Sequence, residues 1–341
     1  MSQFDITVEG GTSVRLPTAG KYCDRDIVVT AEGGGVDDYP FYGDGKTRLY
    51  IHLQEGRTSP RLNVSPNGTV TVDWGDGSAP DVLTGTSTTT LVSTPNHAYP
   101  THGDYVITLT IDGTMGFGNS ASSATTGWCL TNSGDTSASP SVHYMGAILA
   151  AEISDGVVAI GSGSFTNAMK LSKVHIADSV SKIGVGAFSN CRSLRDVVLP
   201  DTITGLDSQM FADCSSLRTI NIPKSVASLR KKSFTNCISL ENITLPNALI
   251  TIGEEAFYSC YSMTSVVIPS SVMTVNPYAF YSCYGMAYYD FTALTAVPNL
   301  LNSNAFSNLP ADCEIRVPAA LVDDWKAATN WSTYADKIVG V

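Results

Sequence analysis

One pattern recurs every 23 residues in the second half of the chain, and it constrains the fold more than any other feature. Each copy opens with a phenylalanine: Phe165, Phe188, Phe211, Phe234, Phe257 and Phe280. Three residues later, all copies but the first carry a cysteine: Cys191, Cys214, Cys237, Cys260 and Cys283. A fixed period of about 20–29 residues is typical of a solenoid, because one coil cannot bury its apolar side without a neighbour.

Each copy continues with Leu or Met, an apolar alternation and, in four copies, a proline. The alternation predicts a short strand with one face inward, and the proline ends it because it cannot donate to a β-ladder. Gly184 and Gly253 predict a sharp turn near the end of the coil. We interpret the five cysteines as buried, reduced thiols that share one inward phase of the coil, because Ala168 fills that phase in the first copy. The alternative is a disulfide framework.

The A-F-x-x-C-x-x-L-x-x-I-x-L-P pattern resembles the BspA-like subclass of bacterial leucine-rich repeats. The resemblance implies a solenoid over residues 142–310 and a recognition or adhesion surface. The pattern breaks after Phe280, since Phe306 follows it by 26 residues. We therefore expect a C-terminal cap over residues 311–341, with a helix that places Leu321 and Trp325 on one face.

A second pattern lies in residues 37–114. Val70-Thr-Val-Asp-Trp-Gly-Asp-Gly77, Asn96-His-Ala-Tyr99 and Gly103-Asp-Tyr-Val-Ile-Thr-Leu-Thr110 follow in this order. They are similar to the W-G-D-G, H-x-Y and G-x-Y-x-V-x-L pieces of PKD-type immunoglobulin-like domains, which implies a β-sandwich that acts as a spacer or weak binder. We expect His97 to stabilise a turn. The acidic residues around W-G-D-G, which are Asp73, Asp76 and Asp81, predict turn capping, with calcium ligation as the alternative.

Two further segments complete the organisation. Residues 1–36 contain short alternating runs separated by glycines, which predict a small β module for attachment. Part of this module looks like short β segments near the start of phage and prophage tail proteins. Residues 115–141 are rich in Ser, Thr and Gly and predict a polar connector. The chain therefore reads as mostly β and modular, and its first residues carry no pattern of a Sec signal peptide.

Composition and motif searches exclude several functions. The net charge of −11 argues against nucleic acid as a partner, and no stretch of sequence is long and apolar enough to insert into a membrane. The five histidines have no metal-ligand spacing, and no nucleophile elbow, P-loop or dinucleotide fingerprint occurs. We predict no enzyme activity, no catalytic residue, no metal and no cofactor.

Tyrosine is concentrated in the last coils. We predict a ligand-binding face made of Tyr258, Tyr261, Tyr281, Tyr284 and Tyr288, because tyrosine gives a large, rigid contact area at low entropic cost. Equivalent phases in neighbouring coils should place Tyr258 beside Tyr281 and Tyr261 beside Tyr284. The alternative is that these rings only cover the last coils.

These observations predict a non-enzymatic recognition or adhesion protein. The N-terminal resemblance favours a phage or prophage virion component, such as a tail fibre or tip, that binds a bacterial surface receptor of protein or glycan. Other virion proteins would then contact the N-terminal module, and a trimer is possible. The alternative is a bacterial adhesin, at the cell surface or secreted, that binds host protein or glycan. A glycan-active enzyme or an inhibitor is a more distant alternative.

Overall fold

The computed structural model of the protein describes residues 39–118, 128–131 and 142–341. The chain divides into two units, Met1–Gly34 and Gly35–Val341, and every described residue belongs to the second. The predicted attachment module (residues 1–36) and most of the predicted connector therefore lie outside the described residues.

The first part of this unit is built from antiparallel strands, which are β1 (Thr47–Leu53), β2 (Arg61–Asp73), β3 (Asp81–Thr86), β4 (Val92–Ser93), β5 (Gly103–Phe117) and β6 (Leu130–Thr131). The strands form because apolar residues alternate along them, as at Val70 and Val72, which are fully buried on β2. Strand β2 pairs with β3 on one side and with the second half of β5 on the other. The Trp74 side chain that follows β2 completes the core of this part.

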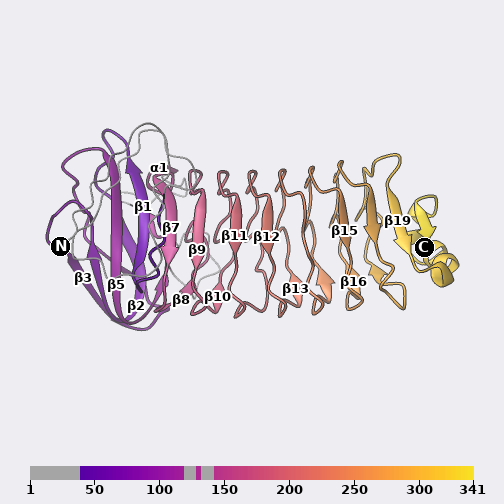
Figure 1. Cartoon of the computed structure of the whole chain (residues 1–341), viewed down its shortest axis with the longest axis horizontal. Helices are drawn as coiled ribbons and strands as arrows, with labels where there is room; N and C mark the ends of the chain where they lie inside the picture. Colours follow the sequence, from indigo (N-terminus) through magenta and orange to yellow (C-terminus); the bar gives the residue numbers. More distant parts are fainter. Residues whose placement is uncertain (1–38, 119–127, 132–141) are drawn as a thin grey trace, which may run out of the picture. The chain divides into compact units, whose positions relative to one another are not determined.

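Strand β5 joins this part to the coils. Its first half pairs with β1, and β1 pairs on its other side with β7 (Ile148–Ile153). The end of β5 pairs with β8 (Val157–Ile160). The two strands of the first coil thus extend sheets that begin before the repeats (Figure 1). Strand β5 runs three residues past the expected domain boundary at residue 114, and Met115 and Phe117 on it are fully buried.

The repeats form a β-solenoid of about eight turns over residues 150–340, so the predicted mostly-β fold is confirmed. Coils stack in line in Figure 1, and their strands form two parallel ladders. One ladder contains β7, β9 (Lys173–Ile176), β11 (Asp196–Val198) and β12 (Thr219–Asn221), and resumes with β15 (Ser265–Val267), β17 (Tyr288–Asp290) and β19 (Glu314–Val317). The other contains β8 and β10 (Lys182–Ile183), then β13 (Ser228–Leu229), β14 (Thr251–Ile252), β16 (Thr274–Val275) and β18 (Asn299–Leu300).

The predicted core residues are buried as expected. The six repeated phenylalanines are fully buried, and successive rings stack with centroids 5.1–5.8 Å apart. Phe117 from β5 adds a ring before Phe165, and Phe306 adds one after Phe280 despite the 26-residue spacing. The column of rings therefore runs from the sandwich to the cap without a break.

The repeated cysteines are free and buried, and each has a role that the sequence did not reveal. The thiol of Cys191 donates a hydrogen bond of 3.2 Å to the carbonyl oxygen of Phe165 in the preceding coil. The other four cysteines repeat this bond at 3.1–3.2 Å with the phenylalanine 26 residues earlier. Each of these carbonyl oxygens already accepts a hydrogen bond from the backbone amide three residues later. Cysteine therefore fills the core and adds a second hydrogen bond to that oxygen from the next coil.

The left-handed turn positions differ from those expected. Gly184 and Gly253 do not have positive φ; a side chain there would lie within 3 Å of the neighbouring coil. The left-handed residues lie two before and two after each phenylalanine, as at Gly186 (φ 61°) and Asn190 (φ 61°). Glutamine, lysine, glutamate and tyrosine occupy the first of these positions in later coils, so glycine does not mark it consistently.

The C-terminal cap contains the predicted helix. A 3-10 helix (η1, Ala319–Leu321) leads into α2 (Val322–Ala327), followed by η2 (Trp331–Tyr334) and strand β20 (Ile338–Gly340), which pairs with β19. The Trp325 and Trp331 rings are buried against each other at 4.6 Å and against Phe291. The predicted lid over the final coil is therefore present, and Trp325 is its buried anchor.

Candidate functional site

Two pairs of tyrosines form the ladders that the sequence predicts. The rings of Tyr258 and Tyr281 stack with centroids 5.0 Å apart and planes 8° apart. The rings of Tyr261 and Tyr284 stack at 5.5 Å and 29°. Tyr261 and Tyr284 are 45% and 56% exposed, so this second ladder lies at the surface rather than in the core.

One residue outside the predicted face joins these ladders. Tyr278 packs edge-on against Tyr281 at 5.5 Å and is 38% exposed. Its left-handed backbone (φ 58°) holds it beside the ladder, two residues before Phe280. The sequence placed Tyr278 in the tyrosine-rich stretch, but the repeat alone did not reveal that this residue lies in the turn beside the ladder.

Tyr288 has a different environment. It lies on strand β17, and the guanidinium of Arg316 in the next coil covers its ring at 3.8 Å from the centroid. Arg316 in turn donates to Glu314 at 2.8 Å. The structure thus brings together four of the five predicted tyrosines and adds Tyr278, whereas Tyr288 belongs to a cation–π contact on the strand.

Stacking determines what the ladders can present to a ligand. Since the paired rings cover each other's faces, the ladders offer ring edges and hydroxyl groups, and only the outermost faces remain open. The pKa of Tyr258 is raised, first by partial burial and then by the neighbouring Tyr281 phenol. The Tyr258 hydroxyl group therefore stays protonated at neutral pH, and phenol groups of this kind can both donate and accept hydrogen bonds.

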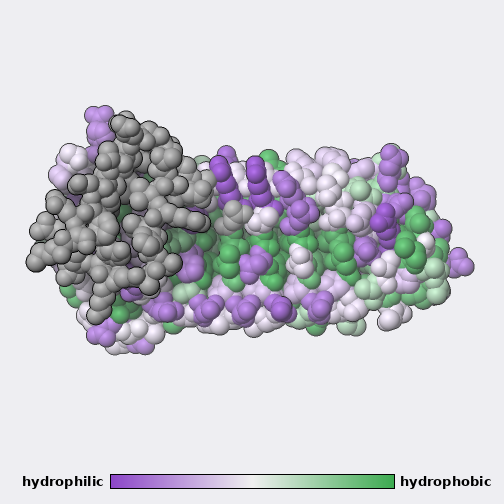
Figure 2. All heavy atoms as spheres, in the orientation of Figure 1, coloured by the Kyte–Doolittle hydropathy of each residue, from purple (hydrophilic) through white to green (hydrophobic). Residues whose placement is uncertain are grey.

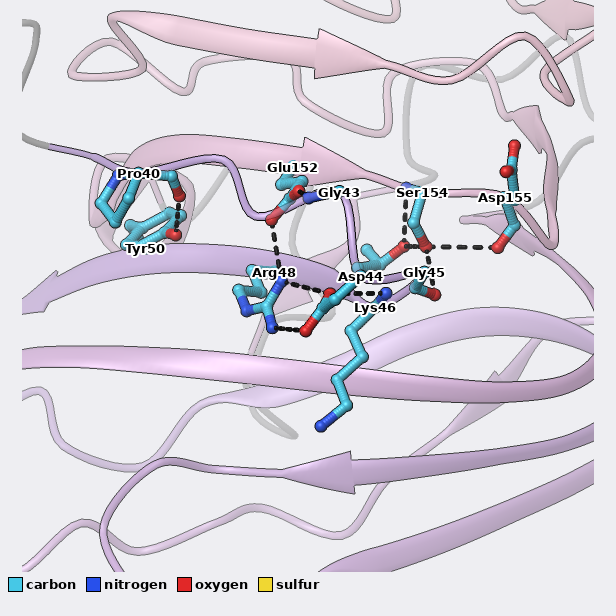
Figure 3. A network of polar contacts seen from close by, with 11 residues as sticks. Pro40, Gly43, Asp44, Gly45, Lys46, Arg48, Tyr50, Glu152, Ser154 and Asp155 are labelled. Atoms are coloured by element: carbon cyan, nitrogen blue, oxygen red, sulfur yellow. Dashed lines mark hydrogen bonds and ion pairs between the residues drawn. The ribbon is translucent and has the colours of Figure 1, made fainter. Parts of the chain in front are cut away.

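A largely buried polar network joins the start of the described chain to the first coil (Figure 3). Arg48 donates to Glu152 at 2.9 Å and to both oxygens of Asp44, and Glu152 also accepts from the Gly43 backbone amide at 2.8 Å. Arg48 and Glu152 are 8% and 2% exposed. The guanidinium holds the pKa of Asp44 below its ordinary value. All these polar groups satisfy one another, so the network stabilises the junction and is not an open site.

The W-G-D-G and H-x-Y residues also satisfy one another. The imidazole of His97 stacks on Trp74 at 4.5 Å, and its Nε2 lies 2.8 Å from an Asp76 oxygen. The Trp74 indole donates to Asp81 at 2.9 Å. Asp73 and Asp76 accept from backbone amides two residues later, as turn caps do. Within the described ranges, no group of three or more His, Cys, Asp or Glu side chains is placed to hold a metal ion.

The coils define the class of the protein: a parallel β-solenoid of stacked leucine-rich repeats whose surface carries a tyrosine cluster. Comparison with protein families makes this more specific. Residues 158–287 match the BspA type leucine-rich repeat region in six copies. The repeat region is therefore of the BspA type, and the PKD-type assignment of residues 37–114 stays a prediction.

Solved structures of repeat proteins are similar to this chain. A leucine-rich repeat protein of T. pallidum is 28% identical, with a TM-score of 0.44 over 48% of this chain and 78% of the other. One from Eubacterium ventriosum is 23% identical, with a TM-score of 0.42 over 46% of this chain and 42% of the other. A leucine-rich cell surface protein of Faecalibacterium prausnitzii is 20% identical, with a TM-score of 0.31 over 51% and 74%.

A comparison with curated proteins gave no match. Across the part of the chain that the structure describes, none of the helices has the length and apolar character that crossing a membrane would require.

Proposed function

We propose that this protein is a non-enzymatic recognition protein whose solenoid binds a ligand at a bacterial or host surface through the tyrosines of its last coils. The observation that carries the proposal is the pair of in-phase ladders, Tyr258–Tyr281 and Tyr261–Tyr284. Earlier coils place Thr, Ser, Ala, Met, Arg or Ile at these two phases, so the fold does not require tyrosine there.

Two features of the scaffold support this function. The Phe column and the cysteine–carbonyl bonds make the core of each coil nearly identical, and this holds surface side chains at fixed spacing without using them for stability. A rigid platform lowers the entropy lost when a ligand binds. BspA-type repeats in other proteins usually serve adhesion or recognition, which agrees with a binding role and favours an adhesin.

Binding of the labelled chain to intact bacterial and host cells would test the tyrosine face. A variant with Tyr258→Thr, Tyr281→Thr, Tyr261→Ser and Tyr284→Ser uses residues that occupy the same phases in other coils, so folding should be retained. We expect it to lose most of the binding. Ile250→Ser and Met273→Ser remove exposed apolar side chains from another phase and serve as the control. Equal binding by both variants would contradict the proposal.

The location of the protein distinguishes a bacterial adhesin from a virion component. The comparisons favour a bacterial adhesin, at the cell surface or secreted, over the virion component that the N-terminal segment suggested, and they give the virion assignment no support. We therefore place the protein at the cell surface or in the medium. Mass spectrometry of cell envelope, medium and induced phage particles from the source strain would test this. Recovery from intact particles alone would reverse the assignment.

A further inference from the structure

The turn-to-strand edge that carries the Tyr261–Tyr284 ladder in the last coils carries exposed cations in the first coils. We define this edge by the positions four to eight residues after each phenylalanine. In the coils that start at Phe165, Phe188 and Phe211 it carries the exposed cations Lys170, Arg192, Arg195 and Arg218. In the later coils the same edge carries Ile238, Tyr261 and Tyr284, which are 40–56% exposed. It also carries one exposed acid, Glu241, in the coil between the cations and the tyrosines.

Backbone hydrogen bonds join neighbouring coils along the part of this edge that runs from Ser172 to Glu241. The Ser216 amide donates to the Arg192 carbonyl oxygen at 3.2 Å, and the Arg218 amide donates to the Arg195 carbonyl oxygen at 2.9 Å. The Arg195 and Arg218 side chains therefore start from directly adjacent coils. Like charges on neighbouring strands destabilise a sheet slightly, so this arrangement is not explained by stability.

Carboxylates do not neutralise these cations among the described side chains. Elsewhere on the solenoid, cations pair with acids of a neighbouring coil, as Arg230 does with Asp207 at 2.8 Å and Lys231 with Glu254 at 2.9 Å. Arg192 donates instead to the neutral Asn190 side chain at 2.7 Å. Arg195 and Arg218 form no ion pair with a described carboxylate, which leaves their guanidinium groups available to an external anion.

We propose that this edge binds an acidic polysaccharide that runs along the solenoid axis, with its carboxylates on the arginines and its hydroxyl groups on the tyrosine ladders. The inference rests on the proposed function and names the class of its ligand. Guanidinium groups form charge-assisted hydrogen bonds with carboxylates, and protonated phenols both donate to and accept from sugar hydroxyls. An extended polymer matches an edge that runs over several stacked coils.

The stacking of the rings favours a glycan over a single-stranded nucleic acid. Binding of unpaired bases relies on open aromatic faces, and the faces of Tyr258 with Tyr281, and of Tyr261 with Tyr284, are turned toward each other. Screening over about 8 Å at physiological salt limits repulsion from the net charge of −11 to nearby groups. The exposed charged side chains described on this edge in the first three coils are cationic.

The test uses the full chain and three soluble probes: a purified oligogalacturonate, its methyl-esterified form and a single-stranded DNA oligomer. Calorimetry at low and physiological ionic strength measures each affinity. The variant Arg192→Ser, Arg195→Ser, Arg218→Ser removes three cations, and serine already occupies these phases at Ser215 and Ser172. The control Lys224→Ser, Arg230→Ser, Lys231→Ser makes the same change in net charge elsewhere on the coils.

We expect the oligogalacturonate to bind more tightly at low salt, and the arginine variant to lose roughly tenfold in affinity while the control stays within about twofold. Equal binding of the esterified probe, or tighter binding of DNA through the same arginines, would overturn the inference. Absence of binding to any probe would also overturn it. If the chain then still bound cells through its tyrosines, the proposed function would stand; if it did not, both would fail.

Discussion

Replacing Phe234 by alanine tests whether the column of rings holds the solenoid together. The Phe234 ring is fully buried and stacks on Phe211 at 5.8 Å and on Phe257 at 5.5 Å. Removing a buried phenylalanine from a core costs about 3–5 kcal/mol of unfolding free energy. Two ring contacts are lost here, and neither neighbour can move far because each stacks on a further ring. We therefore expect a loss near about 4 kcal/mol.

Urea unfolding measures this loss with two independent signals. Far-UV circular dichroism reports the strands of the coils, whereas tryptophan fluorescence reports Trp74 in the sandwich and Trp325 and Trp331 in the cap. Tyr261→Ala is the matched control, because that ring is 45% exposed and should cost less than about 1 kcal/mol. A loss below about 1 kcal/mol for Phe234→Ala would refute the reasoning.

Four further outcomes are expected. Glu152→Gln should lower the unfolding free energy by about 3 kcal/mol, because it leaves Arg48 buried with one fewer charge partner; a double-mutant cycle with Arg48→Met measures the coupling. Gly184→Ala should cost about 2–3 kcal/mol, since its Cβ would lie 2.6 Å from the Ser162 amide nitrogen. Gly186→Ala has φ 61°, and its Cβ would make only ordinary contacts at 3.8 Å or more, so it should cost only about 1 kcal/mol in the same urea assay. Burial alone would raise the pKa of Asp76, but hydrogen bonds from Ser78 and His97 outweigh it and lower that pKa. The contribution of the ionised Asp76 to the unfolding free energy should therefore be complete above about pH 4 and be lost as the pH falls through the folded pKa. The urea midpoint of Asp76→Asn should vary less with pH over that range than the midpoint of the unchanged protein. Burial raises the pKa of Cys214 and Cys283 to about 12, so iodoacetamide at mildly alkaline pH should label the seven described cysteines only after unfolding, as read by peptide mass spectrometry.

The core of the solenoid could be predicted from sequence because its period is exact over six copies. Phe and Cys each recur at a fixed position of the repeat, and only the stacking of coils buries both. The hydrogen bond from each thiol to a carbonyl group 26 residues earlier was not predictable in the same way. It depends on the offset between neighbouring coils, which the repeat length does not specify.

The junction was the least predictable part of the fold. The sequence separates a sandwich from a solenoid by a polar stretch, and this suggested independent domains. In the structure, β1 and β5 extend the two ladders of the coils, and Arg48 reaches Glu152 across 104 residues of sequence. Pairing between distant strands leaves no local pattern, so the shared sheets were visible only in three dimensions.

For the candidate site, the phases were predictable and the orientation of the rings was not. Equal positions in neighbouring coils placed Tyr258 beside Tyr281 and Tyr261 beside Tyr284. Side-chain rotamers then decided that the ring faces cover each other, and the position of Arg316 decided that the Tyr288 face is covered as well. The surface is consequently richer in hydroxyl groups and edges than in open aromatic faces.

Because the coils stack in phase, adding or removing one repeat in the gene changes the length of the tyrosine ladders. A duplication of the 23 codons for residues 257–279 would insert one more coil with the same core and one more rung in each ladder. The inserted coil would pack against coils that carry the same kinds of residue at the inward positions, so no side chain would need to change. Recombination between repeats could thus lengthen or shorten the contact surface in single steps, and with it the number of ligand units that one molecule holds.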